Sequence, residues 1–127
     1  MSDANSNKQA VLDFYNLALN EGKPEEAVRR HLGDVYIQHN PQAGDGAEAF
    51  ISFVSGFRSQ FQGLRFQFKR AIAEGDLVAV HSHMKVSADD RGTAVMDFFR
   101  LENGRIVEHW DALQPVPEES ANANTMF

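Results

Sequence analysis

The sequence predicts an α+β fold in which three N-terminal helices pack on one face of a curved antiparallel sheet. In the first half of the chain, apolar residues recur at every third or fourth position, which is typical of helices with one buried side. From Gly63 onward they alternate at every second position, which is typical of strands. Helices followed by consecutive strands are expected to cover the sheet from one side.

The first half of the chain contains three predicted helices and one extended segment. The helices are predicted over residues 6–22, 24–31 and 47–60. Ser6 and Gln9 have the spacing of a capping box, and Pro24 is favourable in the first turn of the second helix. Residues 35–37 are β-branched or aromatic and predict a short strand, which runs into a loop rich in Gly and Asn.

The second half of the chain consists of predicted strands. They extend over residues 64–73, 77–87, 93–101 and 105–113. Turn sequences separate them, and Asn103-Gly104 is the strongest hairpin signal. Residues 116–127 are expected to form a flexible tail, and the whole chain, residues 1–127, a single domain.

The composition excludes several classes of function. The chain has no cysteine, which excludes disulfides, zinc–thiolate sites and cysteine nucleophiles. Its formal net charge of −6 is unfavourable for binding nucleic acid or an anionic membrane. No glycine-rich phosphate loop or nucleophilic serine motif is present. Because the N-terminus is polar and no apolar run is long enough to span a membrane, we expect a cytoplasmic protein.

The turn at Asn103-Gly104 can take two forms. A two-residue turn pairs Glu102 with Arg105, whereas a three-residue turn with a glycine bulge pairs Leu101 with Arg105. The two forms differ by one residue in register, so they place the side chains of the last strand on opposite faces of the sheet.

We favour the three-residue turn, because it brings Arg100 and Glu108 together on the outer face as an ion pair. The inner face then carries Asp97 opposite His109, with Asp111 diagonal to them. Two carboxyl groups and an imidazole on an apolar face are candidates for acid–base catalysis, since burial and a neighbouring carboxylate both raise the pKa of a carboxyl group. An alternative interpretation stays open, in which both aspartates are hydrated residues at strand ends.

Three further histidines are candidates for the site. His39 lies between the predicted short strand and its loop, where it contributes to the mouth of a pocket or orders the turn before Pro41. His81 and His83 face the same side of one strand, and such a pair can bind a metal together with a carboxylate. No other pattern supports a metal site, so we interpret both as lining or surface residues.

Residues 36–41 read YIQHNP, residues 74–80 read EGDLVAV and residues 99–111 read FRLENGRIVEHWD. Together these segments resemble the SnoaL-like branch of the NTF2-like superfamily, over about residues 8–115. The resemblance implies a cone-shaped α+β barrel with a pocket at its open end. It also implies the chemistry of polyketide cyclases, which close a ring by intramolecular aldol condensation with acid–base residues and without metal or cofactor.

The resemblance implies site residues as well. Asp111 matches the catalytic aspartate of the cyclases, and His39 resembles a histidine of their cavity. Asp97 stands where the cyclases have a histidine, so the substrate and the reaction can differ from theirs.

We therefore expect a cofactor-independent cyclase, isomerase or lyase that acts on a small hydrophobic or aromatic compound with an enolisable carbonyl. Its catalytic residues are predicted to be Asp111, Asp97 and His39. The predicted substrate-binding residues are His109, Tyr15, Phe53, Phe57 and Phe99. One alternative is a non-catalytic module for ligand binding or dimerisation. An epoxide hydrolase ranks lower, because it needs an arginine between two aspartates and Arg100 is predicted to lie on the outer face.

The outer face of the sheet is predicted to be the interface of a homodimer. Its apolar residues are Met96, Phe98, Ile106 and Trp110. A monomer rarely exposes such a patch, and a two-fold contact between two sheets would bury it.

Overall fold

The computed structural model describes residues 3–127, and the predicted helices and strands are present. The helices are α1 (Ala4–Tyr15), a short π-helical continuation η1 (Asn16–Asn20), α2 (Pro24–His31) and α3 (Ala47–Gln60). The strands are β1 (Leu32–Gln38), β2 (Arg65–Glu74), β3 (Leu77–Lys85), β4 (Thr93–Glu102) and β5 (Arg105–Pro115). The α+β class predicted from the sequence is confirmed.

The start of α1 differs from the prediction. The helix begins at Ala4 and is capped by Asp3, whose side chain accepts a hydrogen bond from the backbone N–H of Ser6 at 2.7 Å. Ser6 therefore lies inside the first turn, and the predicted capping box of Ser6 and Gln9 is wrong. The reason is that an aspartate three residues before Ser6 supplies an equally good cap and extends the helix by one turn.

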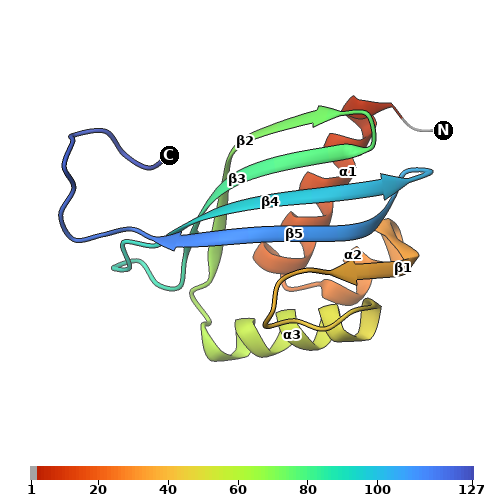
Figure 1. Ribbon diagram of the computed structural model, residues 1–127. Coiled ribbons are helices and arrows are strands. Elements are labelled where there is room, and N and C mark those ends of the chain that lie inside the picture. Colours follow the sequence, from red (N-terminus) through yellow and green to blue (C-terminus); the bar gives the residue numbers. More distant parts are fainter. Residues whose placement is uncertain (1–2) are drawn as a thin grey trace.

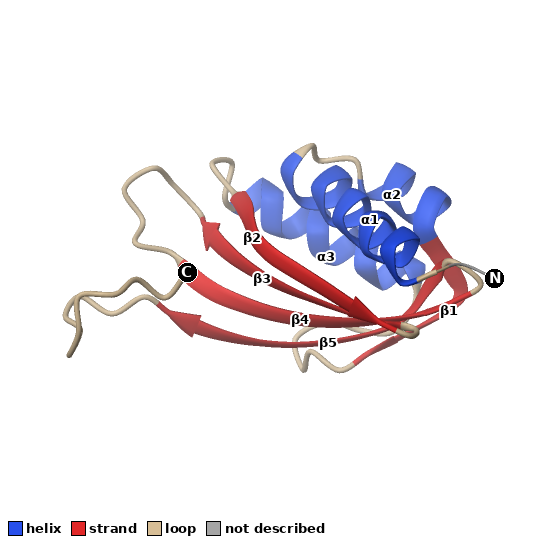
Figure 2. Cartoon of the chain, turned by 90° about the horizontal axis from the view of Figure 1, so that it is seen from above, coloured by secondary structure: helices blue, strands red, loops and turns tan. Residues whose placement is uncertain are grey.

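The five strands form one sheet with the order β1-β5-β4-β3-β2 (Figure 1). Strands β2 to β5 are antiparallel neighbours as predicted, but β1 pairs with β5 in parallel, so the sheet is mixed rather than purely antiparallel. The sheet is curved, and all three α-helices cover the same face (Figure 2). Phe14, Phe99 and Ile106 are fully buried between the two layers.

The hairpin between β4 and β5 corrects the favoured turn. Asn103 and Gly104 both have positive φ, 51° and 79°, and Glu102 pairs with Arg105, so the turn has two residues. Arg100 pairs with Glu108, yet Leu101 pairs with Ile106, which leaves Val107 as an extra residue in β5.

Because of this bulge, the side chains beyond it face as predicted, although the turn itself was predicted wrongly. Beyond it, Asp97 pairs with Asp111 and Phe99 with His109, so Asp97 lies opposite Asp111 and not opposite His109. The predicted ion pair of the outer face is confirmed, with Arg100 Nε 2.8 Å from Glu108 Oε1.

The structure also corrects the predicted position of Ile106. Its side chain is 0% exposed and belongs to the core, so it cannot be part of the predicted outer patch. The physical reason is the bulge, because the residues on the turn side of Val107 have the opposite alternation from those beyond it.

Residues 116–127 form no helix or strand, and they turn back from the end of β5 (Figure 1). The ring of Phe127 stacks on His83 of β3, with 3.9 Å between ring centroids. The predicted flexibility of this tail stays a prediction. Among the described residues, no helix combines the length and the apolar character that crossing a membrane requires.

The position of Ile106 can be tested by a matched pair of substitutions. Ile106→Ala is expected to lower the free energy of unfolding by about 2–5 kcal/mol, because it leaves a cavity in the core. Ile72→Ala removes the same atoms from a side chain that is 72% exposed, and about 0.5 kcal/mol is expected. Urea denaturation measures both values. Equal losses would contradict the bulged register.

Candidate active site

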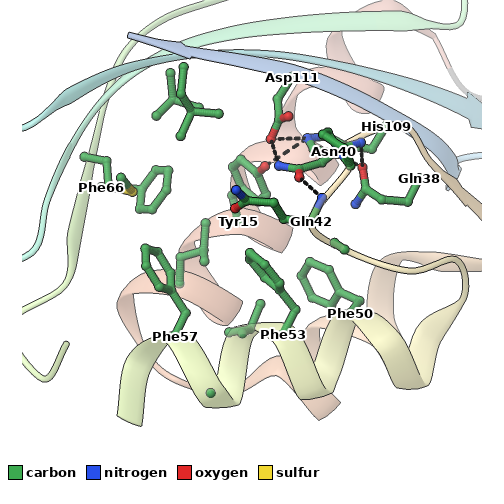
Figure 3. Close-up of a pocket in the computed structure, with 18 of the residues that line it drawn as sticks. Tyr15, Gln38, Asn40, Gln42, Phe50, Phe53, Phe57, Phe66, His109 and Asp111 are labelled. Carbon is green, nitrogen blue, oxygen red and sulfur yellow. Dashed lines mark hydrogen bonds and ion pairs between the residues drawn. The ribbon is translucent and has the colours of Figure 1, made fainter. Parts of the chain in front are cut away.

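A pocket of about 780 Å³ lies between α3 and the sheet (Figure 3). One wall is apolar, because α3 presents a row of aromatic rings to it. Phe50, Phe53 and Phe57 come from α3, and Phe66 faces them from β2. The opposite wall is polar. Its labelled members in Figure 3 are Tyr15, Gln38, Asn40, Gln42, His109 and Asp111.

Three polar side chains meet at the polar wall, where Tyr15 and His109 line the pocket and Asp97 lies behind them. The Tyr15 hydroxyl donates to Asp97 Oδ1 at 2.7 Å and lies 3.1 Å from His109 Nε2. His109 Nε2 lies 2.7 Å from the same Asp97 oxygen. All three residues are buried, and Asp97 is only 1% exposed. They come from α1, β4 and β5, so the cluster links the first helix to the sheet.

Asp111 is the carboxylate that reaches the pocket. Its Oδ2 accepts a hydrogen bond from Asn40 Nδ2 at 3.1 Å and lies 3.9 Å from His109 Nε2. Asn40 is itself held, because its Oδ1 accepts the backbone N–H of Gln42 at 2.8 Å. The arrangement places a fixed carboxylate at the junction of the polar and apolar walls.

Burial controls protonation in this cluster. It raises the pKa of Asp97, against the opposing effect of the hydrogen bond with His109. Burial also raises the pKa of Tyr15 and of Tyr36, and in both the nearby Asp97 adds to the effect. Tyr15 therefore stays a hydrogen-bond donor at physiological pH, and burial favours the protonated form of Asp97.

The structure brings five of the predicted residues to the pocket. They are Tyr15, Phe53, Phe57, His109 and Asp111. Asp97 lies behind Tyr15 and His109 and is in hydrogen-bond contact with both. Phe99 is fully buried in the core, where its ring lies 5.0 Å from that of Tyr15, so it supports the site and does not line it.

His39 is not brought to the pocket. Its ring lies on the outer face of the sheet, stacked on Trp110 with 4.9 Å between centroids, and its Nε2 is 2.8 Å from Glu108 Oε2. The structure therefore corrects the prediction that His39 is a cavity residue. Side chains alternate along β1 and its continuation, so Gln38 and Asn40 point inward and the residue between them points outward.

Sequence reasoning missed Tyr36, Gln38 and Asn40, although all three line the pocket. The signal was available, because the three residues are spaced by two and begin within the predicted strand of residues 35–37. Extending the alternation past residue 37 would have placed them on the same face.

Asp97, His109 and Asp111 each offer an atom within 4.8 Å of the others, a spacing also seen around metal ions. In this structure those atoms are engaged by one another and by neighbouring donors. His109 Nε2 faces Asp97 and Tyr15, and Asp111 accepts from Asn40. As found, the arrangement is a hydrogen-bonded network suited to moving protons.

The profile of the SnoaL-like domain family matches residues 11–109, most of the chain. The chain belongs to this family. None of the curated proteins matches it in sequence.

Solved structures with low sequence identity share the fold of this SnoaL-like protein. TsrD from Streptomyces laurentii has a TM-score of 0.75 at 21% identity, over 89% of this chain and 91% of TsrD. A candidate polyketide cyclase from Bacillus cereus has a TM-score of 0.73 at 18% identity, over 85% and 74% of the two chains. A candidate ketosteroid isomerase from Kribbella flavida has a TM-score of 0.73 at 15% identity, over 96% and 87%. These likenesses show the NTF2-like fold.

The raised pKa of Asp97 predicts how stability depends on pH. Above the ordinary carboxyl pKa of about 4, the native protein keeps a proton that the unfolded chain releases, until the raised native value is reached. Stability is therefore expected to fall as pH rises through this window. Asp97→Asn removes the titration and is expected to flatten the curve. Urea unfolding of both proteins between about pH 4 and pH 8 measures this, and parallel curves would contradict it.

Proposed function

We propose that this protein is a cofactor-independent acid–base enzyme of the SnoaL-like type, which acts on a hydrophobic or aromatic compound with an enolisable carbonyl. The observation that supports the proposal is the placement of Asp111. Its carboxylate lines a pocket with an aromatic wall, is held by Asn40, and lies beside the buried group of Tyr15, Asp97 and His109. The cyclase and isomerase names of two structural relatives agree with this class of chemistry.

In the proposed reaction, Asp111 accepts a proton from the carbon next to the substrate carbonyl. The electron pair of that C–H bond moves to the carbonyl oxygen and forms an enolate. Tyr15 and His109 also line the pocket, so the hydrogen-bonded group that they form with Asp97 can pass a proton to the enolate oxygen as its charge develops. The enolate carbon then attacks a second carbonyl in a cyclase or takes the proton back at another position in an isomerase.

Asp97 and Asp111 would divide the acid and base roles. Burial raises the pKa of Asp97, so this carboxyl supplies a proton to the hydrogen-bonded group. Asp111 lies at the pocket surface, where it can meet the substrate. One buried carboxyl group beside a second one at the pocket surface is an arrangement that acid–base catalysis can use.

The aromatic wall would bind and desolvate the substrate. Phe53 is 38% exposed and Phe57 lies beside it, with 6.0 Å between their ring centroids, so both offer ring surface to a ligand. Excluding water strengthens the hydrogen bonds that form in the pocket. His39 has no part in the proposed chemistry, because its ring lies on the other face of the sheet.

The alternatives make different demands. A non-catalytic binding module would use the same pocket, with Asp111 and Asn40 only orienting the ligand. An epoxide hydrolase would need an arginine beside the aspartates. Arg100 instead lies on the outer face, where it donates to Glu108 and Glu102.

The base role of Asp111 can be tested without knowing the natural substrate. Enolisation in D₂O replaces the α-protons of a ketone with deuterium, and NMR follows this exchange for a panel of aromatic and alicyclic ketones. Asp111→Asn keeps the shape of the side chain but cannot accept a proton. The exchange rate is expected to fall by about a hundredfold to ten-thousandfold, with a melting temperature at or above that of the wild type.

Asp76→Asn is the matched control, since it makes the same change at an exposed turn between β2 and β3. Its exchange rate and melting temperature are expected to equal those of the wild type. Full exchange in Asp111→Asn, or loss explained by unfolding, would show that Asp111 is not the base. Ketone binding without exchange in the wild type would favour the binding module.

A homodimer through the outer face of β4 and β5 is also part of the proposal, with Ile106 removed from the interface. Met96 and Phe98 are 48% and 50% exposed, and Phe98 pairs with Trp110, whose ring stacks on His39. Burying these side chains would favour association of two copies. Sedimentation is expected to show a dimer at micromolar concentration and a monomer for Phe98→Asp. A monomeric wild type would contradict this interface.

A further inference from the structure

The side-chain amide of Gln38 lies at the inner end of β1, against the ring of His109. Its Oε1 is 3.1 Å from the backbone N of His39 and 3.0 Å from the backbone N of Asn40. Both backbone groups can only donate, so the amide atom that faces them is the oxygen. The amide nitrogen donates in the other direction, to the Tyr36 hydroxyl at 3.3 Å.

This orientation determines where His109 carries hydrogen. His109 Nδ1 is 2.7 Å from Gln38 Oε1. Because that oxygen cannot donate, Nδ1 must carry a hydrogen and donate it. In a neutral His109 ring, Nε2 then has only a lone pair, and it is this nitrogen that faces Asp97 and Tyr15.

The contact between His109 Nε2 and Asp97 Oδ1 needs a proton of its own. The hydrogen of the Tyr15 hydroxyl is already directed at Asp97 Oδ1, over 2.7 Å. A lone pair and an ionised carboxylate oxygen at 2.7 Å would repel each other. One proton must therefore lie between the two groups, on the carboxyl or on the imidazole, and in either form the pair has no net charge.

We infer that Gln38 is a positioning residue, which holds His109 in the Nδ1–H tautomer and thereby keeps one transferable proton on the Asp97–His109 pair. Without an acceptor at Nδ1, a neutral His109 could donate from Nε2 to an ionised Asp97. The pair would then hold one proton fewer. The other titratable groups facing His109 are Tyr15 from α1, Tyr36 from β1 and Asp111 from its own strand.

The inference rests on the proposed function for its catalytic meaning. When Asp111 takes the α-proton, the pair can give its own proton to the enolate oxygen, so that an enol forms and the total charge of the site is unchanged. When Asp111 returns a proton to carbon, the enol gives its O–H proton back to the pair, so that both groups are restored. A pair without that proton could only accept one and would leave the enolate charge unneutralised.

The tautomer can be observed directly, with no substrate. Two-bond ¹H–¹⁵N correlation spectra of protein labelled with ¹⁵N-histidine distinguish a protonated ring nitrogen from an unprotonated one, and the spectrum of His109→Asn identifies the signals of His109. The wild type is expected to show a protonated Nδ1 across the accessible pH range. Gln38→Met, of similar size but with only a weakly accepting sulfur, is expected to shift His109 towards Nε2–H and to lower the pH at which the pair loses its proton by about one unit.

Two further variants test whether the acceptor oxygen is the cause. Gln38→Glu keeps an acceptor at the same place, so it is expected to retain the Nδ1–H tautomer and to raise the pH at which the pair loses its proton. Gln42→Met makes the same change as Gln38→Met at an exposed position that lines the same pocket, and it is expected to leave the His109 signals unchanged. Thermal melts show whether each variant is folded.

Kinetics separate this inference from the proposed function. In the deuterium exchange assay, Gln38→Met is expected to lower kcat at least tenfold with little change in KM, and Gln38→Glu to restore part of it with a shifted pH profile. If the wild type exchanges no ketone, the proposed function fails while the tautomer result stands. An Nε2–H tautomer in the wild type, or an unchanged Nδ1–H tautomer in folded Gln38→Met, would overturn the inference.

Discussion

The extra residue at Val107 is the constraint on which the site depends. Successive side chains of a strand point to opposite faces, so a two-residue turn without a bulge would direct His109 and Asp111 away from the helices. Adding one residue to β5 alone reverses that direction beyond the bulge. The same residue explains why Ile106 is buried on one side of it while Glu108 lies on the outer face at the other.

The buried polar group is costly, and the hydrogen bonds around it show how the cost is limited. Tyr15, Asp97 and His109 satisfy one another over distances of 2.7–3.1 Å. Asp97 Oδ2 nevertheless has no hydrogen-bond partner among the described residues. Burying an oxygen without a hydrogen-bond partner costs much less free energy on a neutral carboxyl group than on an ionised one. The unpaired oxygen weakens the fold, and it also favours the protonated form of Asp97. Such a conflict with stability is expected where a chain performs chemistry.

The fold and one half of the site could be predicted from the sequence. The period change after Gly63 gave the helices and strands, because amphipathic elements record their buried face locally. The inward placement of Asp97 and Asp111 was correct although the turn was not. The register of a three-residue turn differs by two residues from that of a two-residue turn followed by a bulge. Because side chains alternate with a period of two, both registers direct these side chains inward. Nothing local in the sequence distinguishes them, and Ile106 was misplaced for that reason.

The other half of the site comes from β1, whose partner could not be predicted. Parallel pairing with β5 joins segments far apart in the chain, and no turn signals it. This pairing determines which side chains of residues 38–40 face the pocket. The backbone N–H of His39 donates to the carbonyl of His109 at 3.0 Å, which fixes the alternation of its neighbours. With the His39 ring held outside by Glu108 and Trp110, Gln38 must turn inward, to the only ring nitrogen of His109 that Asp97 and Tyr15 leave free. The contacts of the His39 ring on the outer face and the hydrogen bond from His109 to Gln38 on the inner face are thus two consequences of one strand register. A change that weakens the outer contacts is expected to disturb the inner hydrogen bond.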